Sequence, residues 1–388
     1  MIKVAISTLS QNVRTPTGLL SWFVQFAKLS ARLRPGLNCR FIASRETRAY
    51  FEEHVAGVKT DIVGWDSSHP LRRLFSEHFL VGRHLRRHNY NALLVANAGT
   101  APIYLPRSIK LLQCVYGLQQ SAAKDIRLRS RIYRNLLFAR TVRRADCIVV
   151  NSEYSRAQLH AIAPSAAPKV RVIPHGYDPE LYFPGPLSQD GILALKRLKL
   201  DGPFILFVSQ VYPYKNVHTA VEAFCKFIKE SGLPHRMAVV GKFSDAWGSG
   251  EAYRERLLAI ARDFGIEDRL LFCAGVPSGT LRALYSTAEV YIQPSLAETF
   301  GRTSLEAMAC GCPVVAANAA ATPEVVGDAG LYFEGTDSSA AAAALLRLAL
   351  DRDLRQRCVK RGLDRAGQFS LDQEVLQLTA ALVEMAEQ

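Results

Sequence analysis

Two series of short, β-branched segments alternate with amphipathic stretches along the chain, and a break rich in proline and glycine separates the series. Strands that alternate with helices form parallel sheets with right-handed crossovers. The sequence therefore predicts an α/β protein with two Rossmann-like, doubly wound domains. The expected strands are residues 2–7, 92–95, 110–115, 147–150 and 170–173 in the first series, and residues 204–208, 237–240, 270–272, 290–292 and 313–316 in the second.

The break at residues 174–186 sets the expected domain boundary, because proline and glycine at this density are typical of a linker. We expect a first domain of residues 1–185 and a second of residues 186–370. A length of 388 residues agrees with two domains, since one hydrophobic core rarely extends so far. The helical segment 371–386 has no strand after it and can pack against either domain, including back on the first. Such sheets bind ligands at the carboxyl ends of their strands, so we expect the active site in an interdomain cleft.

The apolar runs, the first residues and the cysteines of the sequence bear on where we expect the protein to reside and whether we expect a metal site. The sequence has no apolar run of about 18 residues, and its first residues lack the features of a signal peptide. We therefore expect a cytoplasmic protein, either unattached or peripheral on the inner face of the cell membrane. The eight cysteines are scattered without zinc-ligand spacing, so we expect reduced core residues and no metal site.

The net charge of +13 is unevenly distributed. Residues 1–180 hold 27 Lys and Arg against 11 Asp and Glu, a balance of +16, whereas residues 181–388 hold 21 against 24, a balance of −3. A basic first half favours a polyanion or an anionic membrane surface as partner.

The most informative motif is the segment 294–311, which leaves an expected strand, turns through a loop and enters a helix near Arg302 that ends at Gly311. The backbone amides around Phe300, Gly301 and Arg302 would then lie at a helix N-terminus. Such a terminus binds phosphate, because its first amides have no partner within the helix.

Two carboxylates bracket this loop. Glu298 lies in the loop and Glu306 lies in the helix, and a carboxylate can accept paired hydrogen bonds from vicinal hydroxyls of a sugar or a ribose. The alternative is that Glu306 is a solvated side chain and that Glu298 caps the helix. Lys215, at a strand-to-helix junction, can neutralise a diphosphate; the alternative is an ordinary surface lysine.

The strand, the Glu-x7-Glu loop and the helix, followed by Gly311-Cys312-Pro313 and by residues 323–330, resemble the donor site of glycosyltransferase family 4, whose members adopt the GT-B fold. The resemblance implies a donor-binding second domain and an acceptor-binding first domain. It implies that Glu298 contacts the donor sugar, that Glu306 contacts the ribose and that Lys215 is catalytic with Glu298. Further donor-binding positions that it implies are Gly18, Ser209, Gln210, Val276, Thr299, Phe300, Gly301, Arg302 and Thr303.

Four places in the sequence depart from the family pattern. Gln210 stands where the family often has arginine, and of the family's glycine-rich loop at residues 15–18 only Gly18 is present. The segment 113–118 lacks the His-Asp pair of many members, and Tyr116 is the residue there that can still donate a hydrogen bond to donor or acceptor. His175 stands where asparagine is common; it is either a cleft residue or a linker histidine bonded to the backbone.

Arginines crowd two segments of the first half. Residues 125–146 predict an amphipathic helix with a cationic face, and residues 71–89 hold a second set. Such a helix can lie on anionic lipid, or it can simply be solvated. The arginines are Arg127, Arg129, Arg131, Arg134, Arg140, Arg143 and Arg144 in the first segment, and Arg72, Arg73, Arg83, Arg86 and Arg87 in the second.

The resemblance implies a retaining hexosyltransferase that needs no metal or other cofactor and moves a mannose- or glucose-type sugar from a nucleoside-diphosphate donor. The acceptor would be a saccharide or a polyprenol-linked saccharide in envelope polysaccharide synthesis. A nucleotide-sugar epimerase or a phosphorylase of the same fold is the alternative. Nucleic-acid binding is a further alternative that the sequence pI of about 9.5 favours, but no nucleic-acid-binding module is recognisable, so we expect no such partner.

Overall fold

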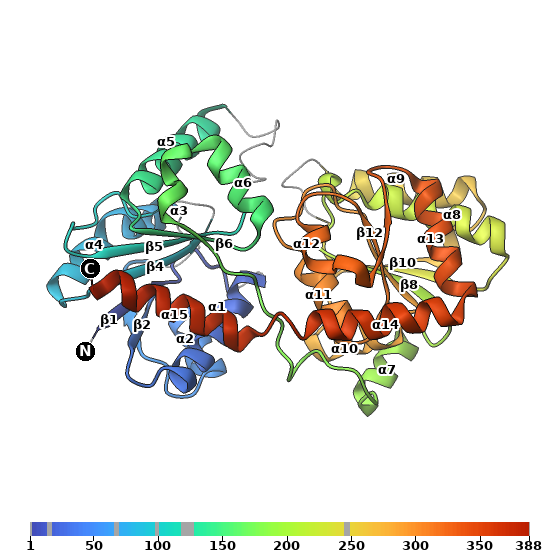
Figure 1. Ribbon diagram of the computed structural model, residues 1–388, viewed down its shortest axis with the longest axis horizontal. Helices are drawn as coiled ribbons and strands as arrows, with labels where there is room; N and C mark the ends of the chain where they lie inside the picture. The colour runs from blue at the N-terminus through green and yellow to red at the C-terminus, as the bar shows by residue number, and fades with distance from the viewer. Residues whose placement is uncertain are drawn as a thin grey trace. The chain divides into compact units, whose positions relative to one another are not determined.

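The structure is a computed structural model that describes residues 2–13, 18–65, 70–97, 101–117, 128–243 and 249–387, with side chains placed outside residues 70 and 128–134. The chain divides into two compact units, of which the first joins Met1–Pro174 to Leu371–Gln388 and the second is His175–Ser370 (Figure 1). Each unit is built around a parallel sheet with helices between most of its successive strands, as the alternating pattern predicts.

In the described part of the first unit, the sheet has seven strands in the order β3-β2-β1-β4-β5-β6-β7. The order reverses between β1 and β4, as in doubly wound folds. The strands are β1 (Lys3–Ser7), β2 (Asn38–Ala43), β3 (Thr60–Ile62), β4 (Ala92–Asn97), β5 (Lys110–Val115), β6 (Cys147–Val150) and β7 (Val170–Val172). The helices are α1 (Gly18–Leu33), α2 (Arg45–His54), α3 (Pro70–Phe75), the π-helical turn η1 (Ser76–Leu80), α4 (Val81–Arg87), α5 (Leu128–Arg144), α6 (Glu153–Ile162), η3 (Pro164–Lys169) and α15 (Leu371–Glu387).

In the described part of the second unit, the sheet has six strands in the order β10-β9-β8-β11-β12-β13. The strands are β8 (Phe204–Val208), β9 (Arg236–Val240), β10 (Leu270–Cys273), β11 (Val290–Gln293), β12 (Val314–Ala317) and β13 (Leu331–Phe333). The helices are α7 (Gln189–Arg197), η4 (Pro213–Lys215), α8 (Val217–Ser231), α9 (Gly250–Asp263), η5 (Glu267–Arg269), α10 (Ser278–Thr287), α11 (Arg302–Ala309), α12 (Thr322–Val326), η6 (Gly327–Ala329), α13 (Ser338–Leu350) and α14 (Arg352–Ala366).

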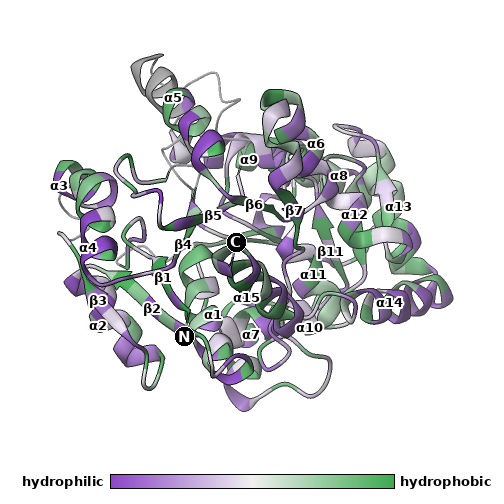
Figure 2. Ribbon diagram, turned by 60° about the vertical axis from the view of Figure 1, so that its left-hand side comes forward, coloured by the Kyte–Doolittle hydropathy of each residue, from purple (hydrophilic) through white to green (hydrophobic). Residues whose placement is uncertain are grey.

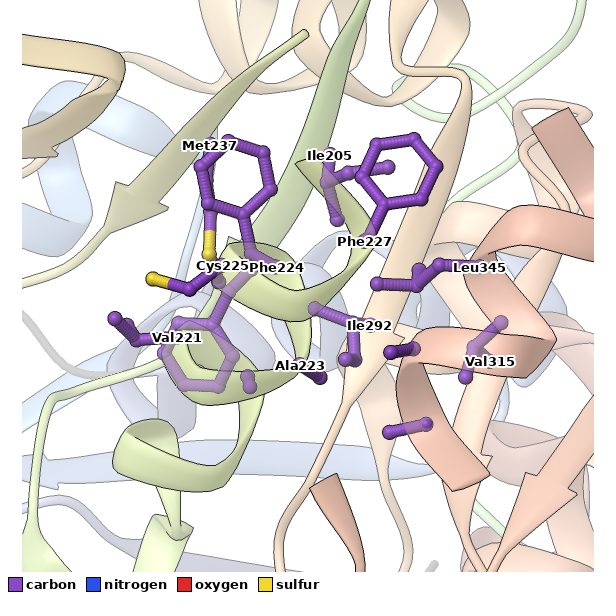
Figure 3. Packing of buried hydrophobic residues seen from close by; sticks show 14 of the residues in the cluster. Ile205, Val221, Ala223, Phe224, Cys225, Phe227, Met237, Ile292, Val315 and Leu345 are labelled. Carbon is purple, nitrogen blue, oxygen red and sulfur yellow. The ribbon is translucent and has the colours of Figure 1, made fainter. Parts of the chain in front are cut away.

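Helix α8 shows how the second core is filled. Its apolar residues recur with helical spacing and face the sheet, and Gly232 ends the helix in the left-handed conformation, with a φ of 67°. Figure 3 shows Phe224 and Phe227 of this helix in one buried cluster with Ile292 of β11 and Leu345 of α13. Burying each such ring stabilises the unit by roughly 1.5–3 kcal/mol.

The C-terminal helix α15 packs on the first unit, alongside α1 (Figure 1). The indole of Trp22 donates a hydrogen bond of 2.7 Å to the buried carboxylate of Glu374, and Arg32 pairs with Asp372 at 2.9 Å. Leu378 joins the apolar cluster of the first sheet. The last 18 residues therefore complete the core of a unit that began more than 350 residues earlier in the chain.

The boundary between the units lies after Pro174, not at residue 185 as the linker composition predicts. The Tyr177 amide donates to the Phe369 carbonyl at 3.2 Å, which ties the segment to the end of the second unit. Arg282 of α10 donates to the carbonyls of Phe183 and Gly185 at 3.3 and 3.2 Å. Proline and glycine shape this segment, but these contacts attach it to the second unit.

All eight cysteines carry unpaired thiols, and all but the half-buried Cys39 are buried. Burial raises the pKa of the Cys310 thiol to about 12, so the thiol stays protonated at neutral pH. Across the described ranges, no group of three or more His, Cys, Asp and Glu side chains is arranged to hold a metal ion, and no helix is both long and apolar enough to cross a bilayer.

Candidate active site

The loop after β11 leads into α11 through a residue with an unusual backbone. Gly301 has a φ of 96° and a ψ of 48°, a left-handed conformation that glycine adopts without the strain of a side chain. No side chain caps this helix. Within the described residues, the amides of Phe300, Gly301, Arg302 and Thr303 have no hydrogen-bond acceptor. The helix therefore begins with a group of unpaired donors suited to an anion.

Lys215 and Glu298 form an ion pair beside this loop. The Lys215 ammonium, at the end of η4, lies 2.5 Å from a carboxylate oxygen of Glu298, and each side chain is only 12% exposed. Lys215 is therefore not a solvated surface lysine. Glu298 binds the lysine and does not cap α11, so the structure decides against both alternatives left open by the sequence.

Several hydrogen bonds hold the pair in place. Asn216, also in the left-handed conformation with a φ of 58°, donates from its amide group to the carbonyls of Pro294 and Gly335 at 3.0 and 3.2 Å. The bond to Pro294 fastens the start of α8, next to Lys215, to the loop that carries Glu298, and the bond to Gly335 fastens it to the segment after β13. The Tyr291 hydroxyl, from β11, donates to the Thr303 hydroxyl at the start of α11 at 2.8 Å, which ties the two ends of the loop together. Neither Asn216 nor Tyr291 was predicted from the sequence as a site residue, although Asn216 directly follows Lys215.

Glu306 lies in the second turn of α11 and is 9% exposed. It is thus a buried carboxyl and not a solvated side chain. The hydroxyl of Tyr285, from α10, donates to its Oε2 at 3.2 Å. Burial raises the pKa of Glu306 to about 7, while the charge of Arg302 and the Tyr285 bond oppose that rise. A buried carboxyl whose pKa is raised in this way, which makes the folded protein less stable at neutral pH, is typical of a functional site.

Replacing Glu306 by glutamine is expected to stabilise the protein above pH 7. The ordinary pKa of this carboxyl is 4.5, and because its folded-state value of about 7 is higher, the folded protein loses stability as the pH rises from 4.5 to 7. The full loss is about 3 kcal/mol. Glu306→Gln removes that loss, so its melting temperature should exceed that of the wild type at pH 8 and approach it toward pH 4.5. A melting curve across this range checks the sign, with exposed Glu230→Gln as the control. If the melting temperatures of the variant and the wild type changed with pH in the same way, the raised pKa of Glu306 would be contradicted.

Buried polar atoms without a hydrogen-bond partner concentrate around the same loop. Among the described residues, these include the hydroxyls of Ser295, Ser304 and Thr322, the side-chain oxygen of Gln293 and the Nε of Arg302. Most buried polar groups in proteins are bonded, and exceptions are frequent at functional sites. The loop and α11 therefore hold unused donors and acceptors on several sides.

The remaining predicted donor residues of the second unit lie at the carboxyl ends of neighbouring strands. Ser209 follows β8 and its amide donates to the Val240 carbonyl at 3.0 Å, while the exposed Gln210 accepts a hydrogen bond from Tyr212. Val276 is half-buried in the loop after β10, and Thr299 is buried beside Phe300. These residues thus share one edge of the sheet with Lys215 and Glu298.

His175 lies against the loop between β11 and α11, residues 294–301, which we call the donor loop, because its ring meets the ring of Phe300 edge to face at 5.5 Å. The other predicted cleft residues belong to the first unit. Gly18 is the exposed first residue of α1, and residues 15–17 of its loop lie outside the described part of the chain. Tyr116 follows β5, and its ring meets that of Trp22 at 5.9 Å.

Two arginines of the first arginine-rich segment are bonded to backbone carbonyls. In α5, Arg140 donates to the Ile103 carbonyl, and Arg144 donates to the carbonyls of Pro106 and Ile109 at 2.9 and 2.6 Å. These two side chains hold the loop before β5 and do not form an exposed cationic face. Arg127 and the side chains of Arg129, Arg131 and Arg134 lie outside what the structure describes.

Family models match both parts of the chain. Residues 193–365 match the model described as glycosyl transferases group 1, and residues 28–181 match that of glycosyltransferase family 4. A D-inositol 3-phosphate glycosyltransferase of Acidothermus cellulolyticus is 35% identical over 244 residues, which make up 61% of this chain and 53% of that relative. The chain thus spans about half the length of that relative.

Solved structures share the fold over nearly the whole chain. A sucrose-phosphate synthase from Thermosynechococcus elongatus superposes with a TM-score of 0.75 at 20% identity and covers 99% of both chains. Anabaena HepE, solved in complex with UDP-glucose, has a TM-score of 0.74 at 18% identity and covers 99% of this chain and 100% of its own. These likenesses confirm the predicted architecture of two parallel α/β sheets. With both family models matched, the chain belongs to glycosyltransferase family 4 and has the GT-B fold.

Proposed function

We propose that this protein is a hexosyltransferase that uses a nucleoside-diphosphate sugar and retains the configuration of the anomeric carbon. The observation that carries the proposal is the buried pair of Lys215 and Glu298 next to the unpaired amides at the start of α11. An ammonium and several amide dipoles at one point stabilise a leaving diphosphate, and a neighbouring carboxylate binds sugar hydroxyls. The family of the chain supports this assignment.

In the proposed mechanism, the diphosphate lies against the amides of residues 300–303. It pairs with the Lys215 ammonium, which then no longer pairs with Glu298. Glu298 then accepts hydrogen bonds from the sugar, and Glu306 accepts them from the ribose. Negative charge grows on the diphosphate as the anomeric C–O bond breaks, and the ammonium and the amides stabilise that charge. The acceptor oxygen forms the new bond to the anomeric carbon on the same face, and the leaving phosphate oxygen takes its proton, which gives retention without a metal. Gly18 contacts the donor phosphate from the first unit, and Tyr116 and His175 contact the donor or the acceptor.

A thermal-shift panel of UDP, GDP and ADP, each with and without its sugar, tests the donor site. We expect one nucleotide to raise the melting temperature by several degrees, because a ligand at a hundred times its Kd stabilises a protein by about 2.7 kcal/mol. UDP is the first candidate, since the structurally similar HepE was solved with UDP-glucose. The shift should shrink in Lys215→Ala. A panel in which no nucleotide changes the melting temperature would remove the proposed donor site.

We further propose a cytoplasmic enzyme, peripheral on the inner membrane face, whose acceptor is a saccharide or polyprenol-linked saccharide of the cell envelope. The balance of +16 over residues 1–180 supports an anionic surface as partner. A soluble phosphorylated acceptor is a second candidate, because a relative is named for inositol 3-phosphate.

Incubation with labelled donor, with and without acceptor, separates transfer from epimerisation and phosphorolysis. Mobility shifts with duplex and single-stranded probes, compared with vesicle flotation, separate nucleic acid from lipid.

A further inference from the structure

Four large apolar side chains lie exposed together on the first unit, and we call them the aromatic patch: Trp65, Leu71, Phe75 and Phe79. Leu71 is 84% exposed and Trp65 is 42% exposed. The rings of Trp65 and Phe75 lie 6.4 Å apart, and those of Phe75 and Phe79 lie 5.4 Å apart. Because the last three residues follow one another at intervals of four, they form a stripe along one side of a helix. A contiguous apolar surface of this kind marks an interaction site.

The helix beneath the patch is firmly attached to the unit. Helices α3 and α4 run on without a break through η1, since the joining residues Phe75 and Leu80 have helical φ and ψ. On the opposite side, Val81 and Leu85 are fully buried. The Tyr104 amide donates to the His78 carbonyl at 2.8 Å, in the π-helical turn. The patch is therefore the outer side of a packed helix and not a piece of core that failed to close.

Arginines continue the stripe and flank it. Residues 70–87 contain five arginines against one glutamate, and that Glu77 is paired with Arg73 at 3.6 Å. Arg83 stands four residues after Phe79, on the same side of the helix, and Arg72 and Arg87 are exposed near its two ends. Figure 2 shows hydrophobic and hydrophilic turns next to each other in α3 and α4. The surface thus combines aromatic rings with a cationic border.

We propose that the aromatic patch and its arginines dock on an anionic lipid bilayer, with the rings at headgroup depth and the arginines on lipid phosphates. Tryptophan and phenylalanine favour this depth, and basic residues bind the anionic surface. A second copy of the chain fits less well, because a symmetric contact through the same patch would bring the arginines of both copies together. The inference rests on the membrane contact under the proposed function and names the segment that makes it.

Vesicle flotation of the full chain tests the assignment. The wild type should float with mixed phosphatidylglycerol and phosphatidylcholine vesicles and not with phosphatidylcholine alone. Leu71→Glu/Phe79→Glu should weaken binding to the mixed vesicles by at least about tenfold, because each apolar side chain is lost from the membrane. Arg83→Glu/Arg87→Glu should weaken it similarly. The matched controls are Leu350→Glu, at another exposed leucine, in the second unit (66% exposed), and Arg34→Glu, at an exposed arginine after α1; both should bind like the wild type.

Tryptophan fluorescence provides a second measurement on the same samples. In a Trp247→Phe background, the mixed vesicles should shift the emission to the blue through Trp65, since Trp22 is buried. If both double variants floated as well as the wild type, the aromatic patch would not be the membrane-binding segment, and the membrane contact would lie elsewhere on the protein. Absence of wild-type flotation, or dimers that the patch variants abolish, would overturn the lipid assignment. The nucleotide thermal shift, measured in parallel, reports on the transferase proposal independently.

Discussion

Lys215→Ala and Glu298→Ala are each expected to lower the turnover number by about 10²–10³-fold. Lys215 supplies the full positive charge next to the amides of α11, and the two side chains are in contact at 2.5 Å. Loss of the ammonium removes stabilisation of the leaving diphosphate. Loss of the carboxylate removes a sugar contact and leaves the lysine without its partner. Steady-state kinetics with saturating donor measure the effect.

The same variants should also lose stability, because each leaves a largely buried charge unpaired, at a cost of a few kcal/mol. Turnover must therefore be compared below the melting temperature of every variant. Lys229→Ala, at the other end of α8, is the matched control and should retain normal turnover. The double variant Lys215→Ala/Glu298→Ala separates the two effects, since it restores charge balance without restoring catalysis. Turnover within a few-fold of the wild type in either single variant would remove that residue from the catalytic role.

Gly241→Ala is expected to destabilise the second unit by more than about 3 kcal/mol. Gly241 follows β9 with a φ of 146°, and an added Cβ would overlap the carbonyl oxygen of Ser209. Its amide also donates to the Cys273 carbonyl at 2.8 Å. This glycine thus lets the loops after β8, β9 and β10 approach one another beside the donor loop. Denaturant unfolding of the two proteins gives the difference in free energy.

Gly232→Ala provides a matched control for this prediction. Gly232 also has a positive φ, of 67°, but an added Cβ would meet no atom within 4 Å. Its replacement should therefore cost only about 1 kcal/mol, the strain of the left-handed conformation alone. If Gly241→Ala were no more destabilising than Gly232→Ala, the close approach of the strand ends would not be important for folding.

The strands and the motif helices were predictable because their signals are local. The predicted bounds of β5, β6 and β8 agree with the structure, since buried parallel strands are short apolar runs that can be read directly from the chain. Strands β2, β3 and β13 were not predicted from the sequence. These strands carry polar residues or are only three residues long, and the neighbouring strands complete their hydrogen bonding. The family could be recognised because its donor motif is one continuous segment.

Contacts between distant residues were decided only by the tertiary structure. Lys215 and Glu298 were each identified from local motifs, but their pairing joins residues 83 positions apart. The burial of Glu306 under Tyr285, the attachment of residues 175–185 to the second unit and the return of α15 to the first are of the same kind. The sequence by itself thus determined the alternating order of strands and helices, the family and the chemical character of the candidate site, but not the strands β2, β3 and β13. The charge state and the partners of its side chains depend on which distant atoms exclude water from them, and only the packed chain decides that.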